Sequence, residues 1–458
     1  MADEQKKKVE LAQTLHSRHV TLISLGGIIG AGLFVGSSAA IHIAGPAVLI
    51  SYALSGTLVF LIMQMLGEMA VARPGIGTFA EYAVLGLGDW AGFVTGWLYW
   101  YFWIIVVGVE TIAGATLLQH WVNAPVWQIG LVLIVAMTAT NLMSVLAYGE
   151  FEFWFASLKV AAVVVFILIG LAYIVAFDPG PAHALRQLSA HGGFAPKGWP
   201  AVMDAIPVVI FSMMGSEVAT IAAAETTEPA RNVTRAARTV SLRILLFYVG
   251  SVAVIVMVTP WDAIVPGDSP FIRTLQAIRF PGAGDVMTAI AVTAVLSCLN
   301  SGIYVASRML HELARRGDAP ALFATTSTRR VPSLGILFGT LAGCGAALAS
   351  ILSPHVVFLF LINTSGAIIL FIYAMIALAQ IRFRQRLERQ GETLTLKMWL
   401  FPWLSWAVIA GIAAVLVLMG FNPELRIQLW LSALSVVVVL AALVIRRYPP
   451  WSYAQRTP

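Results

Sequence analysis

Four charged side chains lie inside apolar runs of this sequence that are long enough to cross a lipid bilayer. They are Glu68, Glu110, Lys159 and Glu217. A charged side chain at the centre of a membrane-spanning helix costs about 2.5–3.5 kcal/mol on insertion scales, so such residues usually bind ions or substrates or pair with one another. Each of the four is therefore a candidate functional residue.

Two roles are open to Lys159. A lysine in a low-dielectric environment can lose its proton near neutral pH, and its protonated ammonium could occupy the place of a bound sodium ion. Proton coupling is therefore one possibility. The other is that the side chain extends to the polar interface, since Lys159 lies about two turns from the expected start of its helix.

The three carboxylates have functional and structural explanations. Glu217 follows a polar break in its run, so it could join a gate or proton relay, or accept hydrogen bonds from an opened backbone. Glu110 could meet the amino group of a substrate or pair with another helix. Arg73 follows Glu68 by about one turn, which favours a structural ion pair for Glu68. Arg18 could close the cytoplasmic side by pairing with an acidic group, or only anchor the topology.

The segment 24–34 carries four glycines within an apolar run. Each glycine weakens a helix by about 0.8–1 kcal/mol relative to alanine. Close helix packing by small residues is one explanation, but a helix broken inside the membrane is favoured here, as in transporters. The second half of such a helix presents free N–H groups to an anion such as a carboxylate. The segment 211–217, with Ser, Gly, Ser and Glu in the middle of a run, repeats the pattern.

The composition is that of an integral membrane protein. Of 458 residues, 59% are hydrophobic and 11% are charged, whereas soluble proteins carry about 25% charged residues. Apolar blocks of helix-spanning length exclude a β-barrel. Cys298 and Cys344 lie in apolar runs and imply no disulfide framework. No catalytic or metal-binding motif is present, so we predict no catalytic residue, no metal site and no enzyme.

With about 20 residues per span, the sequence predicts twelve transmembrane helices in an all-α polytopic fold. Basic residues mark the cytoplasmic side of such helices, and 21 of the 28 Lys and Arg fall on the side of both termini against five on the other. The prediction is therefore a multi-pass protein with both termini in the cytoplasm and with Glu150 and Glu152 in a loop after helix 4. The twelve runs are 20–43, 47–72, 90–119, 126–146, 153–176, 201–224, 240–260, 284–310, 331–352, 355–381, 402–420 and 429–446.

Helix 8 of this set carries a polar stripe. Ser297, Asn300, Ser301 and Tyr304 follow one another at spacings of three, one and three, and residues three or four apart share a helix face. Such stripes usually join helices, but opposite two broken helices they become candidates for lining a cavity.

Several segments resemble bacterial amino acid permeases of the amino acid–polyamine–organocation superfamily. They are Ser-Arg-His-Val (17–20), Gly-Gly-Ile-Ile-Gly-Ala-Gly-Leu-Phe-Val-Gly-Ser (26–37), Ala-Gly-Pro-Ala (44–47), Gly-Glu-Met-Ala-Val (67–71), Tyr-Gly-Glu-Phe-Glu-Phe-Trp (148–154) and Arg-Gly-Asp-Ala-Pro (316–320). Within that superfamily, segments 215–225, 297–301 and 398–404 look most like 4-aminobutyrate (GABA) permeases.

The resemblance implies a leucine-transporter-like fold, in which two inverted five-helix repeats with broken helices 1 and 6 are followed by two extra helices. It also implies proton-driven uptake at the bacterial inner membrane. The corresponding segments are a cytoplasmic tail (1–19), the first repeat (20–177), the second repeat (201–381), helices 11 and 12 (402–446) and a cytoplasmic tail (447–458).

The resemblance also assigns site residues by position. The substrate carboxylate would be bound by Gly30, Ala31 and Gly32, and the pocket would be shaped by Phe211, Met214 and Gly215. The polar stripe of helix 8 adds Ser301 as a further candidate binding residue. For proton coupling or gating, the resemblance points to Lys159 and Glu217, and their own positions in the sequence add Glu110 and Arg18 as candidates. Related exchangers have tryptophan where Phe211 stands, which weakens the case for a cation–π contact here.

We therefore predict a proton-coupled amino acid symporter that works by alternating access, for GABA or a similar small zwitterionic amino acid. A permease for aromatic or other amino acids and an amino acid exchanger are the alternatives, and a channel or a transport-like nutrient receptor is less favoured. The predicted partners are a small amino acid and membrane lipid, without nucleic acid or an obligate protein partner. The proton is the coupling ion, and no cofactor is predicted.

Overall fold

The chain folds into a bundle of helices. The computed structural model describes residues 29–73, 78–143, 145–176, 180–215, 217, 244–279, 282–329 and 331–447, and these ranges contain helices but no strand. Eight of the helical segments are long and apolar enough to cross a membrane, and three apolar helices are shorter. The protein is therefore an all-helical, polytopic membrane protein. Arg18 and the first two glycines of the glycine-rich segment lie outside the described residues.

Local signals set several of the helix ends. The Thr78 side chain accepts a hydrogen bond from the Glu81 N–H at 3.3 Å, which is the usual way of capping a helix start. Gly88, with φ of +93°, ends that helix in a conformation that favours glycine. The helices of the first part of the chain are α3 (Ala31–Phe34), α4 (Gly36–Ala44), η1 (Gly45–Ala47), α5 (Val48–Ala72), α6 (Phe79–Leu87), α7 (Asp89–Leu118), α8 (Val126–Met143), α9 (Val145–Ala176) and α10 (Pro181–Ala190).

The second part of the chain contains shorter helices before the long ones. The segment η2 is a π-helix that runs directly into α15. The helices are α11 (Pro200–Asp204), α12 (Ile206–Ser212), η2 (Ile244–Gly250), α15 (Ser251–Val258), η3 (Trp261–Ala263), α16 (Pro270–Ala277), α17 (Ala283–Arg315), η4 (Ala321–Ala324), α18 (Ser333–Ala349), α19 (Pro354–Arg389), α20 (Trp403–Phe421) and α21 (Arg426–Arg447).

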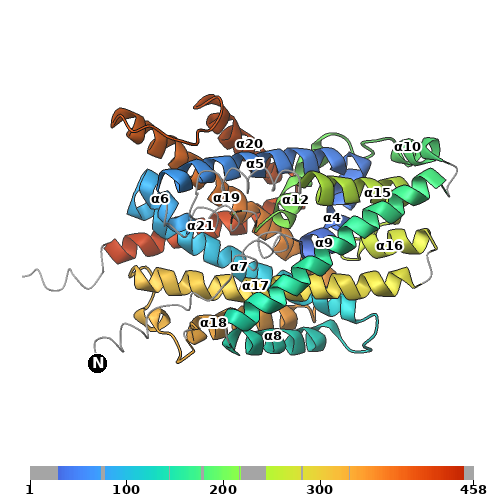
Figure 1. Ribbon diagram of the computed structural model, residues 1–458, viewed down its shortest axis with the longest axis horizontal. Helices are drawn as coiled ribbons and strands as arrows, with labels where there is room; N and C mark the ends of the chain where they lie inside the picture. Colours follow the sequence, from blue (N-terminus) through green and yellow to red (C-terminus); the bar gives the residue numbers. More distant parts are fainter. Residues whose placement is uncertain are drawn as a thin grey trace, which may run out of the picture.

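Three long helices form the centre of the bundle. In Figure 1, α17 runs along the long axis of the molecule, and α9 crosses it obliquely. Helix α7 packs against both α17 and α19. Within an apolar 18-residue stretch of each helix, 78% is buried in α7 and 72% in α17, but only 28% in α20 and 17% in α21. The last two helices therefore lie at the periphery, and the central helices carry the polar groups described below.

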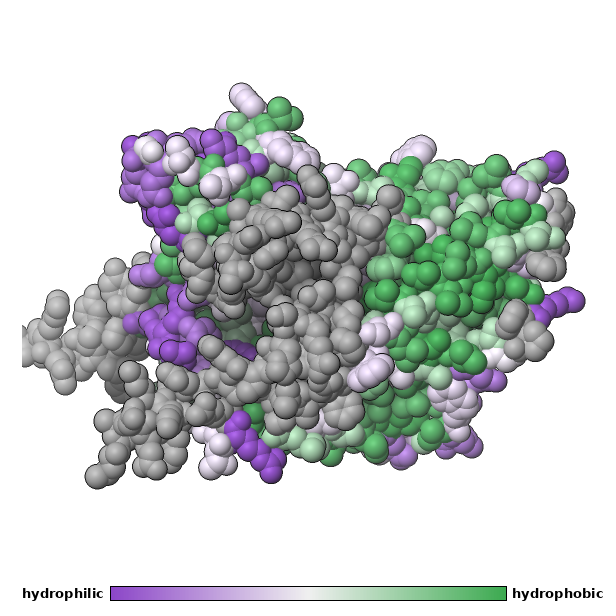
Figure 2. Space-filling model, in the orientation of Figure 1, coloured by the Kyte–Doolittle hydropathy of each residue, from purple (hydrophilic) through white to green (hydrophobic). Residues whose placement is uncertain are grey.

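The outer surface is apolar over a wide area. Figure 2 shows hydrophobic residues over most of the right-hand part of the visible face, with hydrophilic residues at its left end and along its right-hand edge. Large apolar side chains are exposed on α8, α9, α18, α20 and α21. Patches of this extent on a protein surface mark contact with lipid or another protein. Lipid contact accounts for them here, because four of these helices, α8, α9, α20 and α21, are of spanning length.

Two predicted spans are interrupted at the expected places. Gly30 has an extended backbone (φ −144°, ψ −152°), and Val35 separates the short α3 from α4. Helix α12 ends at Ser212, and Gly215 has φ of +97°. Both breaks lie in the core, because the residues on either side of them are buried.

One predicted boundary is wrong in a way that matters for the site. Helix α9 begins at Val145, well before the expected start at residue 153. Glu152 therefore lies within a helix, where it is fully buried, and not in a loop. The prediction is wrong because the polar residues around Glu150 interrupt the apolar run without ending the helix.

Candidate substrate-binding site

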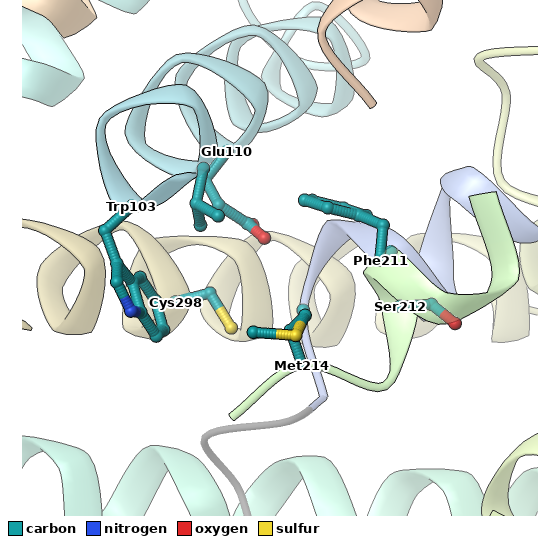
Figure 3. A pocket seen from close by; sticks show the side chains of 9 residues that line it. Trp103, Glu110, Phe211, Ser212, Met214 and Cys298 are labelled. Carbon is teal, nitrogen blue, oxygen red and sulfur yellow. The ribbon is translucent and has the colours of Figure 1, made fainter. Parts of the chain in front are cut away.

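A small cavity lies between the two broken segments. Its volume is about 20 Å³, which is room for about one water molecule. The lining residues come from α3, α7, α12 with the turn after it, and α17, and they are Gly30, Gly32, Trp103, Val106, Glu110, Phe211, Ser212, Met214 and Cys298. In Figure 3 the Glu110 carboxylate and the Phe211 ring point toward one another, with Cys298 and Met214 beside them.

Helix α7 supplies one wall by simple periodicity. Trp103, Val106 and Glu110 are separated by three and four residues, so they share one face of the helix. This face points at the two breaks, and its apolar members sit beside a single carboxylate. This wall therefore offers an apolar surface, against which methylene groups of a ligand could pack, and one ionisable group.

The Glu110 carboxylate binds the backbone at the first break. The Ala31 N–H donates to both carboxylate oxygens, at 3.2 Å and 3.1 Å. Gly30 does not continue a helix, so the Ala31 N–H has no helical acceptor behind it, and an unpaired buried N–H is costly. Glu110 therefore satisfies the N–H that the sequence assigned to a substrate carboxylate. This is a form of the pairing with another helix that the sequence offered, made here to the backbone of α3.

The two broken segments approach one another closely. A Cβ atom at Gly32 would lie 2.6 Å from the Ser212 Cα, and a Cβ at Gly30 would lie 2.4 Å from the Cys298 Sγ. At position 32 an added Cβ would meet backbone of the other broken segment, so glycine is needed there, whereas at position 30 it would crowd the Cys298 and Glu110 side chains. The glycines thus allow close approach as well as opening the helix.

At the second break, Glu217 accepts hydrogen bonds from its own segment and from α7. Its carboxylate oxygens accept from the Gly215 N–H at 3.0 Å and from the Tyr99 hydroxyl at 3.0 Å. Glu217 therefore accepts a hydrogen bond from the opened backbone, which is one of its two predicted roles. Through Tyr99 it also links this break to α7. Nearby, the Tyr373 hydroxyl lies 3.2 Å from the Met214 Sδ, which holds that cavity-lining side chain.

Lys159 is fully buried, which argues against the position at the interface. Its ammonium donates to the Ser297 Oγ at 2.8 Å, and the Ser297 hydroxyl donates to a Glu152 oxygen at 2.6 Å. The Lys159 Nζ and the same Glu152 oxygen are 3.6 Å apart. These three side chains, which we call the lysine cluster, lie behind the wall of the cavity, since Ser297 precedes the lining residue Cys298.

The other predicted site residues are not part of this wall. Ala31 and Gly215 take part through their backbone N–H groups, whereas Ser301 is buried one turn beyond Cys298 and does not line the cavity. Glu68 does form an ion pair, but with Arg384 at 3.2 Å. Arg73, the expected neighbour, pairs with Glu392 instead.

Sequence reasoning missed several lining residues. Trp103 and Val106 could have been found from their spacing to Glu110, which is seven and four residues. Cys298 lies on the polar stripe of α17, three residues before Ser301, but the stripe does not say which of its members faces the cavity. The described residues contain no group of three or more side chains able to hold a metal ion.

Comparison with known proteins places the chain in a family. It matches the amino acid permease family over residues 19–448. It is 46% identical to the gamma-aminobutyric acid permease of Bacillus subtilis over 440 residues, covering 95% of this chain and 94% of that protein. It is 42% identical to the gamma-aminobutyric acid permease of Escherichia coli over 455 residues, covering 98% and 97%. It is 38% identical to the aromatic amino acid transport protein AroP of Corynebacterium glutamicum over 445 residues, covering 96% and 95%. The chain therefore belongs to the amino acid permease family, whose members are transporters and not enzymes.

Proposed function

We propose that this protein imports GABA, or a similar small zwitterionic amino acid, together with a proton and by alternating access. The observation that carries the proposal is the cavity between the two breaks, which offers backbone N–H groups, one carboxylate and apolar walls. The relatives with the highest identity quoted above are GABA permeases, and this supports the choice of substrate.

The cavity suits a linear amino acid chemically. A carboxylate fits the open backbone at Gly30–Gly32, because such N–H groups favour anions. The methylene chain of GABA fits against Phe211, Met214 and Val106, which are apolar. The Glu110 carboxylate is then the group available to the substrate ammonium.

Binding in this mode requires Glu110 to leave the backbone. Its carboxylate holds the Ala31 N–H, and two carboxylates repel one another at the same N–H. The substrate carboxylate would replace it there, and Glu110 would swing to the substrate ammonium. The cavity in its present form is small, which agrees with a site that opens when the substrate enters.

The proton gradient supplies the free energy in this proposal. One proton that crosses 100 mV contributes about 2.3 kcal/mol, and each unit of pH difference adds about 1.4 kcal/mol. Together these support accumulation of a neutral solute by about two to three orders of magnitude. Lys159 is our candidate for the residue that binds the proton, because it is buried in the lysine cluster.

We also propose the finer architecture. The two broken segments would belong to two inverted five-helix repeats, residues 20–177 and 201–381, followed by helices 11 and 12, with tails at 1–19 and 447–458. Twelve spans would place both termini in the cytoplasm of a bacterium, at its inner membrane. The distribution of basic residues supports this orientation.

Uptake into proteoliposomes tests the function. Labelled GABA is offered with and without an acid exterior, and unlabelled β-alanine, 5-aminovalerate and phenylalanine compete. We expect gradient-driven GABA uptake with alkalinisation of the exterior, and loss of its pH dependence in Lys159→Ala. Driven uptake of phenylalanine but not GABA would keep the family and overturn the substrate. One-for-one exchange without pH change would show an exchanger, and flux without saturation would show a channel.

A further inference from the structure

Glu152 and Lys159 lie on the same helix at a spacing that allows their side chains to interact. They are seven residues apart on α9, which is two turns or about 10 Å along the axis, and therefore on one face. Ser297 of α17 fills the gap between the two side chains. All three residues are fully buried.

The geometry of the cluster is that of a proton wire. The distance from the Lys159 Nζ to the Ser297 Oγ is 2.8 Å, and the distance from that oxygen to the Glu152 Oε1 is 2.6 Å. A hydroxyl can accept from one group and donate to another at once, and Ser297 does so here. The second oxygen of Glu152 has no hydrogen-bond partner among the described residues.

From this arrangement we propose that Glu152 is the acceptor that takes the transported proton from Lys159, through Ser297, on its way to the cytoplasm. The proposal rests on the proposed function, since it concerns how that symporter releases its proton. On the predicted orientation, α9 starts at the cytoplasmic side, so Glu152 lies about two turns closer to the cytoplasm than Lys159.

The proposed proton transfer conserves atoms and charge. An N–H bond of the Lys159 ammonium breaks as an O–H bond to Ser297 forms, and the former Ser297 proton forms an O–H bond with Glu152. The products are a neutral amine, an intact hydroxyl and a neutral carboxylic acid. Two buried charges disappear, which lowers the cost of keeping the pair away from water. Water of the cytoplasm then takes the proton from Glu152 when that side of the transporter opens.

Few other titratable groups surround the cluster in the part of the chain the structure describes. Helix α17 brings Cys298, and α7 brings Glu110, which is held by the backbone of α3. The segment η2 brings Tyr248, whose hydroxyl is bound to the Ser212 carbonyl. Helices α8 and α15 carry no charged residue, and α10 packs on α9 with its His183 and Arg186 at the far end. Glu152 is thus the nearest described carboxylate to Lys159.

Measurements of net uptake and of exchange distinguish a role of Glu152 in proton release from a purely structural role. Exchange of labelled for unlabelled GABA across the membrane needs no release of the proton, whereas net uptake does. In Glu152→Gln we therefore expect proton-driven net uptake to fall about tenfold or more, while exchange stays within about twofold of the unaltered protein. The dependence of net uptake on internal pH should also flatten. Glu152→Asp should restore part of the net uptake.

The matched controls come from α17. Ser297→Ala removes the bridging hydroxyl and should repeat the loss of net uptake, with exchange retained. Ser307→Ala removes a hydroxyl that is equally buried on the same helix but bonds only to the Tyr304 carbonyl, so net uptake should persist. Parallel loss of both activities in Glu152→Gln and Ser297→Ala would show a purely structural pair and overturn the proposal. So would unchanged net uptake in Glu152→Gln. Absence of driven uptake in the unaltered protein would instead overturn the proposed function itself.

Discussion

Replacement of Gly32 by alanine tests whether transport depends on the close approach of the two broken segments. The added Cβ would lie 2.6 Å from the Ser212 Cα and 2.9 Å from its Cβ, whereas ordinary contact begins at 3.4 Å, so the two segments would have to separate by about 0.8 Å. The first of these atoms is backbone, so no change of rotamer relieves the overlap. Overpacking of this kind costs about 1–3 kcal/mol, or about 5- to 150-fold in an equilibrium.

We expect this free-energy cost to fall on the conformation in which the cavity is closed, because the two segments touch there. Gly32→Ala should therefore lower GABA uptake per molecule of reconstituted protein by about tenfold, within the range above. The control is Gly345→Ala in α18, where an added Cβ meets nothing within 4 Å and alanine favours the helix; its uptake should be unchanged. Normal uptake by Gly32→Ala, with a thermal stability equal to that of Gly345→Ala, would refute the argument that these segments must touch.

Two ion pairs at the predicted cytoplasmic end should respond differently to disruption, because one is buried and the other is exposed. Glu68 is fully buried and the Arg384 side chain is 11% exposed. Glu68→Leu would leave Arg384 with Glu388 as its remaining carboxylate partner and would remove the acceptor of the Met398 N–H and the Gln380 amide, so it should cost about 1–3 kcal/mol or more. The double variant with Arg384→Met should recover part of this loss. Thermal unfolding in detergent measures both, and equal Tm values for the single and double variants would contradict the reasoning. At the surface, the Arg73 guanidinium holds the pKa of the Glu392 carboxyl below its usual value. Any stability from this pair is therefore present above about pH 4.5 and is lost as the pH falls through the lowered pKa. The Tm of Glu392→Gln should match that of the unaltered protein at pH 7 in high salt, and a salt-independent loss would show a larger role.

The sequence predicted the two breaks because their cause is local. Glycine and serine in the middle of an apolar run weaken the helix wherever they occur, and Gly30 and Gly215 indeed leave helical geometry. It also identified Lys159 as a candidate functional residue, since a charge in an apolar run needs a partner. The partner itself could not be read from the sequence. Ser297 lies 138 residues away, and only the packing of α17 on α9 brings it to the ammonium.

Long-range partners were also missed where a near neighbour seemed sufficient. Arg73 lies one turn from Glu68, yet Glu68 pairs with Arg384, 316 residues along the chain. A surface arginine near the end of a helix turns outward to water more easily than it reaches a buried acid. Arg384, in contrast, extends from a helix that packs directly on α5. Spacing along one helix therefore predicts which residues share a face, and not which of two candidate partners a buried charge takes.

The carboxylates at the two breaks suggest how an empty transporter keeps its opened helices stable. At each break a backbone N–H is freed, and an unpaired buried N–H costs about 1–3 kcal/mol. Glu110 pairs with the one at Ala31, and Glu217 with the one at Gly215. Both acids also link the breaks to α7, directly or through Tyr99. A ligand changes the balance between two conformations only by binding them unequally. A substrate carboxylate that replaces Glu110 at Ala31 meets this condition, because it cuts the link between the first break and α7 while keeping the N–H satisfied.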